Sequence, residues 1–376
     1  MFRMPSLSKT LSTVAIAMGI FGHNVHADAQ MNPLPCDWFD HNGDGVLGAN
    51  TWLFVLGQYG MNAPGAGEAM DVDDSGEVGA RDVLQFLPYF GSNCPVDWAD
   101  TSSGQISGLH LVQHALHTTE LAGLVDDLPA GSVTYRLYAE LAQTTDRILA
   151  VYGDDESPLT FEATGGLYGF GEQVGGSIVV HDVLDALFGT FPALEYSSWL
   201  TLGLEPGTAS NSNISVVGPS PDWVDISAEG VIQWDDAIGG LWFDSGYGQG
   251  GNNGFVLLGQ FTVIGDPSFS GVLNLLAETD SGQSIEFAEG LTFSHEDLSV
   301  LGCMDVAALN FSSAATHEPL GACSYLGDFD GDGAFTVSDL LALIALFGCD
   351  DCPEGDLDGD GLVSVQDILM FLMLFG

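Results

Sequence analysis

The stretch DFDGDGAFTVSDLLALIALFG, residues 328–348, returns 28 residues later as DLDGDGLVSVQDILMFLMLFG, residues 356–376. Each copy begins with a 12-residue loop that has aspartate at positions 1, 3, 5 and 12 and glycine at position 6. Calcium takes about six to eight oxygen ligands, and loops of this kind add a backbone carbonyl at position 7 and need glycine at the sharp turn. The repeat therefore predicts two calcium sites.

Two further copies lie near the N-terminus, and we number the four loops in chain order as loop 1 (40–51), loop 2 (71–82), loop 3 (328–339) and loop 4 (356–367). Position 12 of loop 1 is Thr51, which lacks a carboxylate. More carboxylates usually give tighter binding, so we expect loops 3 and 4 to fill first and loop 1 last, if at all. The predicted ligands are Asp40, Asn42, Asp44 and the carbonyl of Val46 in loop 1; Asp71, Asp73, Ser75, the carbonyl of Glu77 and Asp82 in loop 2; Asp328, Asp330, Asp332, the carbonyl of Ala334 and Asp339 in loop 3; and Asp356, Asp358, Asp360, the carbonyl of Leu362 and Asp367 in loop 4.

An apolar stripe follows every loop and ends at a glycine nine residues after position 12. Its spacing is that of one face of an amphipathic helix, and glycine is a common C-cap. We expect the two helices of each pair to bury their stripes against each other. The stripes are Trp52, Val55, Leu56 and Tyr59; Val83, Phe86, Leu87 and Phe90; Leu340, Leu343, Ile344 and Phe347; and Ile368, Phe371, Leu372 and Phe375.

The N-terminal pair is expected to be the looser one. Gly57 and Pro88 occupy the same helix position in its two units. Glycine there should cost about 1 kcal/mol and proline about 3 kcal/mol. A disulfide between Cys36 and Cys94 would close this region and offset the loss by roughly 4 kcal/mol.

These loop–helix pairs resemble dockerin modules over residues 36–95 and 326–376, about 30% of the chain. The resemblance implies two small α-helical, calcium-loaded modules that attach the protein to a cohesin-like partner. The final loop ligand in that family is aspartate, which is present here as Asp82, Asp339 and Asp367.

The resemblance also implies which residues contact the partner, because dockerins place recognition residues at loop positions 10 and 11. In the C-terminal module the two similar pairs would let a partner dock in either of two orientations; alternatively, the valines pack inside the module. The N-terminal equivalents differ, which implies a different partner or none. The C-terminal positions are Val337 and Ser338, and Val365 and Gln366; the N-terminal ones are Ala49 and Asn50, and Ala80 and Arg81.

Residues 301–325 resemble a short cysteine-closed repeat of secreted bacterial surface proteins, through the run from Gly302-Cys303 to Cys323-Ser-Tyr325. In that repeat an acidic Asp-Asp-Gly-Ser run precedes the second cysteine. Here the run is Glu318-Pro-Leu-Gly. We therefore expect a rigid spacer rather than an ion site.

Residues 1–29 have the pattern of an export signal. A basic start and a short apolar stretch at 11–21 precede an Ala-x-Ala pattern at Ala27 and Ala29. No later run reaches the roughly 20 apolar residues of a membrane-spanning helix. All six cysteines lie beyond this leader, and an even number suits an oxidising compartment. Position along the chain favours the pairs Cys36–Cys94, Cys303–Cys323 and Cys349–Cys352.

The net charge excludes several partners. Without the leader, the chain carries 51 acidic residues against Arg81, Arg136 and Arg147, and it has no lysine. Such a charge excludes nucleic acid and anionic membrane surfaces as electrostatic partners. A hydrophobic content of 46% is nevertheless typical of a folded protein.

Residues 106–300 form the predicted middle domain. Short apolar runs alternate there with clusters of Gly, Pro, Asn and Asp, a pattern typical of an antiparallel sandwich or barrel. The fold class is therefore mixed, with a central all-β domain flanked by the two small α-helical modules. The expected strands include 133–138, 147–152, 198–203, 255–263, 271–277 and 285–287.

Three kinds of active or binding site come into question in the middle domain. His110, His114 and His117 would share one face of a helix, which is a zinc pattern, whereas a strand would turn His117 to the opposite face. Carboxylate pairs for glycoside hydrolysis carry no information among 51 acidic residues. Trp234 and Trp242 stand beside acidic, amide-rich loops that could bind a sugar, although tryptophans are more common in sandwich cores.

We therefore expect a secreted calcium-binding modular protein. Its role would be that of a non-catalytic scaffold or adhesion component whose dockerin-like modules mediate calcium-dependent attachment to a protein partner. The alternative is a dockerin-bearing extracellular enzyme, such as a glycoside hydrolase acting on polysaccharide, or a carbohydrate-binding protein.

Overall fold

The structure is a computed structural model of the full chain. It describes residues 39–40, 43–62, 70–73, 75–94, 100–169, 179–180, 183, 185–207, 214–218, 230–244, 253–279, 283–319, 321–329, 336–350, 352 and 355–374. The predicted leader, Cys36, Asn42, Asp330, Asp332, Ala334 and Phe375 lie outside the described residues. None of the described helices is long and apolar enough to cross a membrane.

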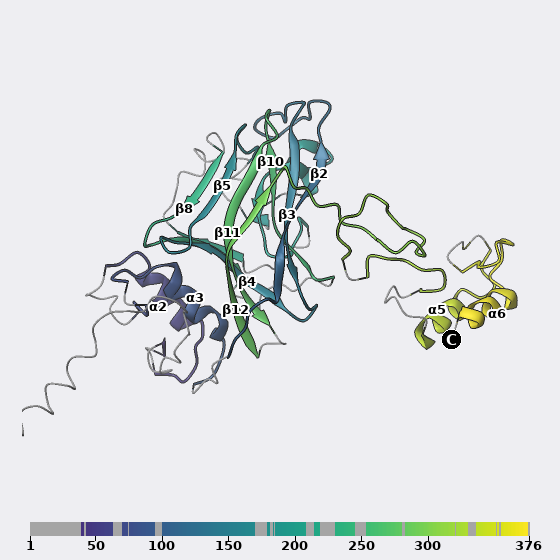
Figure 1. The fold of residues 1–376 in the computed structure, drawn as a ribbon, viewed down its shortest axis with the longest axis horizontal. Helices are drawn as coiled ribbons and strands as arrows, with labels where there is room; N and C mark the ends of the chain where they lie inside the picture. Colours follow the sequence, from purple (N-terminus) through teal and green to yellow (C-terminus); the bar gives the residue numbers. More distant parts are fainter. Residues whose placement is uncertain are drawn as a thin grey trace, which may run out of the picture. The chain divides into compact units, whose positions relative to one another are not determined.

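Residues 100–294 form two sheets, which confirms the predicted antiparallel β domain (Figure 1). The larger sheet runs in the order β1-β12-β11-β4-β9-β7, and β5 pairs with both β11 and β8. The smaller sheet runs β2-β3-β10-β6. Every pairing is antiparallel except that of β1 with β12. The strands are β1 (Asp100–Thr101), β2 (Ile106–Leu116), β3 (Val133–Leu141), β4 (Arg147–Gly153), β5 (Leu159–Ala163), β6 (Trp199–Leu200), β7 (Ile214–Val217), β8 (Val231–Trp234), β9 (Gly240–Asp244), β10 (Phe255–Val263), β11 (Phe269–Thr279) and β12 (Ser284–Ser294).

One hydrophobic cluster joins the two sheets. Phe161 on β5 meets Phe261 on β10 with ring centroids 5.4 Å apart, and Tyr135 on β3 stacks on Phe269 of β11 at 5.9 Å. These contacts cross from one sheet to the other, as expected of a sandwich. Burial of β10 along its whole length explains why its sequence is a continuous apolar run rather than an alternating one.

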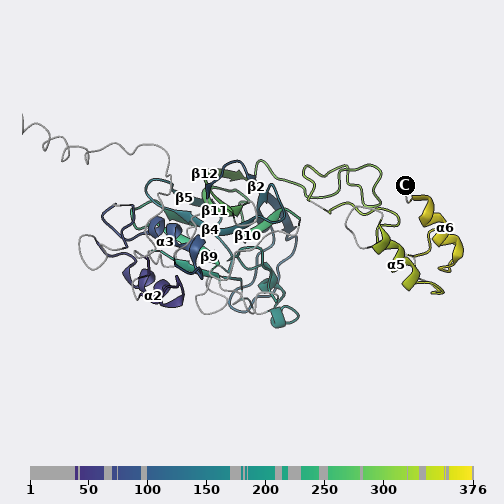
Figure 2. The same cartoon turned by 90° about the horizontal axis from the view of Figure 1, so that it is seen from below.

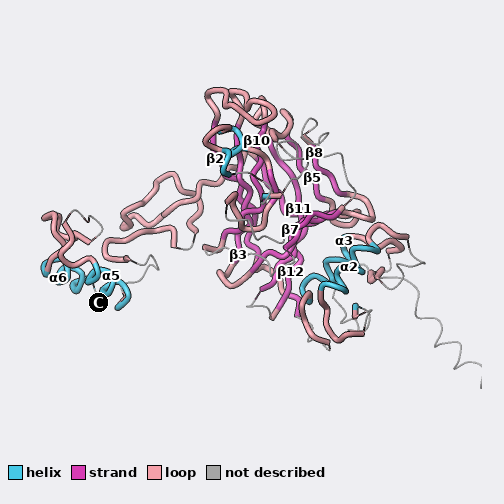
Figure 3. Tube along the Cα trace, turned by 180° about the vertical axis from the view of Figure 1, so that it is seen from behind, coloured by secondary structure: helices cyan, strands magenta, loops and turns pink. Residues whose placement is uncertain are grey.

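Four α-helices follow the four loops (Figures 2 and 3). In the N-terminal module they are α2 (Ala49–Gln58) and α3 (Ala80–Phe86), and in the C-terminal module α5 (Val337–Ala345) and α6 (Val365–Leu374). We use "module" for each such pair of loops with its helices. Trp52 of α2 stacks on Phe86 of α3 with ring centroids 5.6 Å apart.

Pro88 does not lie inside an α-helix, contrary to the helix position that the repeat predicted for it. Helix α3 ends at Phe86 and continues as a single 3₁₀ turn, η1 (Leu87–Tyr89), with proline in its first turn. Because proline has no N–H with which to extend the α-helical hydrogen bonds, the end of α3 just before it is expected.

The predicted stripes are only partly buried in the C-terminal module. Leu343 and Phe371 are buried between α5 and α6, but Ile344, Phe347 and Leu372 are exposed. Two short helices offer each other too little surface to cover a full stripe on both. This module therefore presents apolar side chains to solvent.

Loops 1, 2 and 4 are each tied to the end of the other helix in their module. Leu47 at position 8 of loop 1 exchanges backbone hydrogen bonds with the Gly91 region after α3, and Val78 of loop 2 does the same with Gly60 after α2. In the C-terminal module Gly348 donates to Val363 of loop 4 at 2.8 Å. The N-terminal module is therefore built from two halves related by an approximate twofold axis.

Candidate calcium sites

Loop 2 brings three carboxylates together. Ligand oxygens of Asp71, Asp73 and Asp82 all lie within 4.8 Å of one another. The loop is folded around them, because the amide of Gly76 donates to Asp71 Oδ2 at 3.1 Å and that of Ser75 donates to Asp73 Oδ1 at 3.0 Å. Positions 1, 3 and 12 of the predicted loop thus converge on one point.

One carboxylate oxygen at that point has no hydrogen-bond partner. Asp71 is 6% exposed, and its Oδ1 is buried without a donor among the described residues. A buried and unsatisfied oxygen costs about 1–3 kcal/mol, and more when it is charged. Coordination of a cation by this oxygen would remove the cost.

Position 12 has a second function that sequence reasoning missed. Asp82 accepts hydrogen bonds from the amide of Val72 at 2.6 Å and from that of Gly79 at 2.7 Å. Gly79 is the N-cap of α3, so the carboxylate closes a capping interaction and joins the start of the loop to the start of the helix. In the sequence, the signal for this role is that the aspartate lies three residues after the N-cap.

Loop 4 has the same construction. Asp356, Asp358 and Asp367 bring their oxygens within 4.8 Å of one another. Gly361 donates to Asp356 Oδ2 at 2.7 Å, as Gly76 donates to Asp71 in loop 2.

The position-12 aspartates of loops 3 and 4 repeat the double role. Asp367 accepts from Leu357 at 2.8 Å and from Ser364 at 2.7 Å. In loop 3, Asp339 accepts from Phe329 and from Thr336, both at 2.8 Å.

The pKa of the position-12 aspartate differs between the carboxylate clusters of loops 2 and 4. Burial, and then repulsion from Asp73, raises the pKa of Asp82 to about 7, although the amide of Gly79 lowers it. Burial also acts to raise the pKa of Asp367, but amides led by that of Ser364 lower it overall below its usual value. The pKa of Asp82 therefore lies above that of Asp367.

Loop 1 is folded differently at position 12. Gly45 donates to Asp40 Oδ2 at 2.9 Å, as in the other loops. The hydroxyl of Thr51, however, donates to the carbonyl of Val46 at 3.4 Å. That carbonyl is the predicted position-7 ligand. The corresponding carbonyl of loop 2, that of Glu77, also accepts from a hydroxyl, that of Ser75 at 3.0 Å, so the difference of loop 1 is its lack of a carboxylate at position 12.

The predicted recognition residues lie on the surface of the C-terminal module. Val337 is 61% exposed and Val365 is 55% exposed, and Ser338 and Gln366 are exposed as well. The alternative that the valines pack inside the module is therefore wrong. Further exposed apolar side chains on the two helices are Leu341, Ile344, Leu369, Leu372 and Met373.

No family model, curated protein or solved structure matches this chain. The sites are therefore interpreted from their own geometry.

The three histidines do not form a zinc site. They lie on or just after strand β2, not on a helix, and no group of potential metal ligands among the described residues includes a histidine. A regular strand would turn His117 to the face opposite His114. A β-bulge between Gln113 and Ala115 changes this alternation, and the rings of both histidines lie near that of Tyr196.

His110 has a structural environment that the sequence did not reveal. Its Nδ1 lies 3.0 Å from Ser299 Oγ and its Nε2 lies 3.0 Å from Glu140 Oε2. The His317 ring of the spacer packs against it with centroids 4.2 Å apart. Burial lowers the pKa of His110, and the hydrogen bond with Glu140 opposes this effect. Because the His317 ring packs on His110, the group joins the sandwich to residues 301–325.

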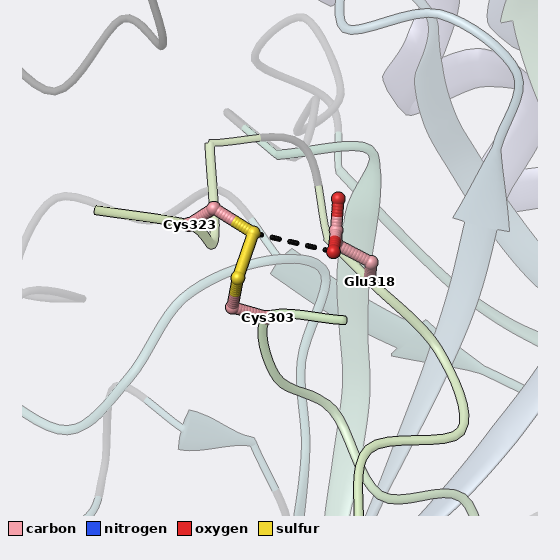
Figure 4. A group of neighbouring side chains, drawn as sticks. All are labelled: Cys303, Glu318 and Cys323. Atoms are coloured by element: carbon pink, nitrogen blue, oxygen red, sulfur yellow. Dashed lines mark hydrogen bonds between the residues drawn. A yellow bond between two sulfur atoms is a disulfide. The ribbon is translucent and has the colours of Figure 1, made fainter. Parts of the chain in front are cut away.

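Two of the predicted disulfides are present. Cys303 pairs with Cys323 and Cys349 with Cys352. Cys94 is also disulfide-bonded, while its predicted partner, Cys36, lies outside the described residues. Figure 4 shows the Glu318 carboxylate facing the first disulfide, with Oε2 3.2 Å from Cys323 Sγ. The bonded sulfurs have no thiolate to offer, so this group is not a metal site.

The two tryptophans considered for a sugar site belong to the core. Trp234 and Trp242 are buried, with ring centroids 6.1 Å apart. They therefore offer no flat face to a ligand. The glycine-rich run at 246–252 that follows β9 lies outside the described residues.

Proposed function

We propose that the protein is a secreted calcium-binding modular protein that acts as a non-catalytic scaffold or adhesion component. Its dockerin-like modules would mediate calcium-dependent attachment to a cohesin-like protein partner. The observation that carries the proposal is the shared geometry of loops 2 and 4. In both, carboxylates from positions 1, 3 and 12 converge, and the position-12 aspartate also caps the exiting helix.

The donor set suits calcium. The converging groups are carboxylates, and position 7 adds a backbone carbonyl, which are the oxygen ligands that calcium prefers. Neither cluster contains cysteine or histidine, so neither has the ligands of a structural zinc site. Bonded cysteine pairs and the leader pattern support an extracellular location.

Calorimetric titration with calcium tests the proposal. We expect the C-terminal loops to fill first and loop 2 next. Loop 1 should fill last or stay empty, because Thr51 supplies no carboxylate at its position 12. Magnesium, which demands smaller octahedral sites, should compete weakly. Equal affinity at every loop would contradict the order, and no calcium uptake would overturn the proposal itself.

The exposed helix faces support the attachment role. Val337 on α5 and Val365 on α6 each begin an apolar row that continues one turn later at Leu341 and Leu369. Large exposed apolar patches are typical of protein interaction sites. Because the rows repeat at corresponding positions of two similar units, a partner could dock in two orientations.

Charge substitution at this surface should abolish partner capture. In the double variant Val337→Glu, Val365→Glu, we expect calcium-dependent capture from the secreted fraction to fall by more than about tenfold, because carboxylates would have to be desolvated in the interface. Leu53→Glu, an exposed apolar position on the N-terminal module, is the matched control and should capture normally. Calcium binding by the double variant shows that its module is folded. Unchanged capture would rule out this surface.

A further inference from the structure

The N-terminal module is bonded to the sandwich through the turn between β8 and β9. The amide of Ala80 donates to the carbonyl of Ile238 at 2.9 Å. The hydroxyl of Tyr59 lies 3.0 Å from that carbonyl and 3.0 Å from the carbonyl of Gly239. Trp52 of α2 packs edge-on against Phe243 of β9, with ring centroids 5.0 Å apart.

Two glycines make this approach possible. A Cβ on Gly79 would come within 2.7 Å of the carbonyl oxygen of Ala237, and one on Gly239 within 3.1 Å of the Cβ of Ala80. Gly239 also has a φ of +63°, which disfavours other residues. The backbone of the module and that of the turn are therefore in direct contact.

An arginine completes the contact. Arg81 Nε lies 3.0 Å from Asp154 Oδ2, and its guanidinium also reaches Glu156 at 3.4 Å and Glu289 at 3.4 Å. All three acids belong to the sandwich, and Asp154 is buried. Arg81 is one of only three basic residues beyond the leader. The guanidinium of Arg81 therefore pairs with three carboxylates at once.

Ala80 and Arg81 are positions 10 and 11 of loop 2. The corresponding residues of the C-terminal module, at Val337 and Val365, are exposed. Ala80, in contrast, is fully buried. In loop 2, the surface that would contact an external partner is therefore occupied by the chain's own sandwich, whereas Ala49 and Asn50, the equivalent residues of loop 1, are exposed.

We infer that calcium bound in loop 2 fastens the N-terminal module to the β8–β9 turn, so that loop 2 and α3 brace the sandwich from within the chain instead of offering a surface to a partner. The inference rests on the proposed calcium binding. Two observations connect the ion to the contact. The buried Asp71 Oδ1 points to a cation in the loop, and Asp82, its position-12 ligand, follows the docking residues Ala80 and Arg81 directly.

The mechanism is local ordering. Asp82 holds Gly79 through a 2.7 Å hydrogen bond, and Gly79 and the next two residues make the contact with the sandwich. An ion that fixes Asp71 and Asp82 fixes this segment in its docked conformation. Anything that binds only the docked state stabilises it by mass action.

Hydrogen exchange of the full-length protein tests the inference. Opening of residues 231–244 requires the module to leave the turn. With saturating calcium, we expect these amides to exchange about tenfold or more slowly than with chelator. Strand β2 in the other sheet serves as the internal reference and should not respond.

Matched variants distinguish the effect of calcium binding from that of the contact with the sandwich. Arg81→Gln retains every loop ligand, so it should bind calcium at loop 2 but lose the slowing. Asp82→Asn should lose both. Two controls should retain the slowing: Asp367→Asn, which removes the equivalent ligand of loop 4, and Arg136→Gln, which removes an arginine that pairs with Glu205 elsewhere.

The outcomes distinguish the two proposals. If calorimetry finds no calcium at loop 2, the proposed calcium function of that loop fails. If loop 2 binds calcium and residues 231–244 exchange at the same rate with and without it, the brace is overturned and calcium binding stands. Loss of the slowing in Asp367→Asn would also overturn it, because the effect would then come from the C-terminal module.

Discussion

Removal of calcium is expected to unfold the C-terminal module within the full-length protein. Among the described residues of this module, the buried core consists of only Leu343, Leu357, Val363 and Phe371, which is too little apolar surface to hold two short helices together. Without the ion, the carboxylates of Asp356, Asp358 and Asp367 also repel one another within a few ångströms. Binding energy is then folding energy. Amide exchange over α5 and α6 should accelerate by a factor on the order of 100 or more.

Hydrogen exchange with mass spectrometry gives this result region by region. Strands β10 and β11 are the control, because their buried cross-sheet contacts do not involve the loops. Asp367→Asn should reproduce the loss at α6 in the presence of calcium. Full protection of both helices in chelator would show that the module folds on its own, which would refute the expectation.

The second large effect is a gain of calcium binding. The variant Thr51→Asp, which places at position 12 of loop 1 the residue type found there in loops 2, 3 and 4, should add one calcium ion per chain. The introduced side chain would supply the missing carboxylate, and the carbonyl of Val46 would lose the hydroxyl that now satisfies it. Calorimetric stoichiometry, compared with that of the natural protein, measures the gain.

A neutral variant controls for the size of the introduced side chain. Thr51→Asn has nearly the same size as the aspartate variant and no charge, so it should add no ion. In chelator, Thr51→Asp should be less stable than the natural protein, since position 51 is completely buried and an unpaired charge there is unfavourable. An unchanged stoichiometry for Thr51→Asp would show that position 12 does not limit loop 1.

The parts that could be predicted from the sequence are those specified by local spacing. The loops and their exiting helices repeat in sequence, and the fixed interval from glycine 6 to aspartate 12 and on to a terminal glycine determines where each helix begins and ends. The strands of the sandwich were found because runs such as 255–263 are too apolar and too short for anything but a buried strand or helix segment. Spacing could not determine which sheet each strand joins.

The parts that could not be predicted depend on contacts between distant segments. Nothing near Arg81 in the sequence indicates that Asp154 and Glu289 lie around it. The same holds for His110, whose partners Glu140 and Ser299 lie on other segments. The scarcity of basic residues was the available signal for Arg81, because each of so few cations is expected to be paired in a chain with 51 acidic residues beyond position 29.

The backbone bonds that tie each loop to the glycine beyond the other helix have a consequence for how the N-terminal module responds to its ion. Loop 2 holds Gly60 through Val78, and loop 1 holds Gly91 through Leu47. An ion that orders loop 2 therefore also orders the end of α2, and through that helix the neighbouring loop. One ion in loop 2 would then be enough to order both halves of the module, even with loop 1 empty.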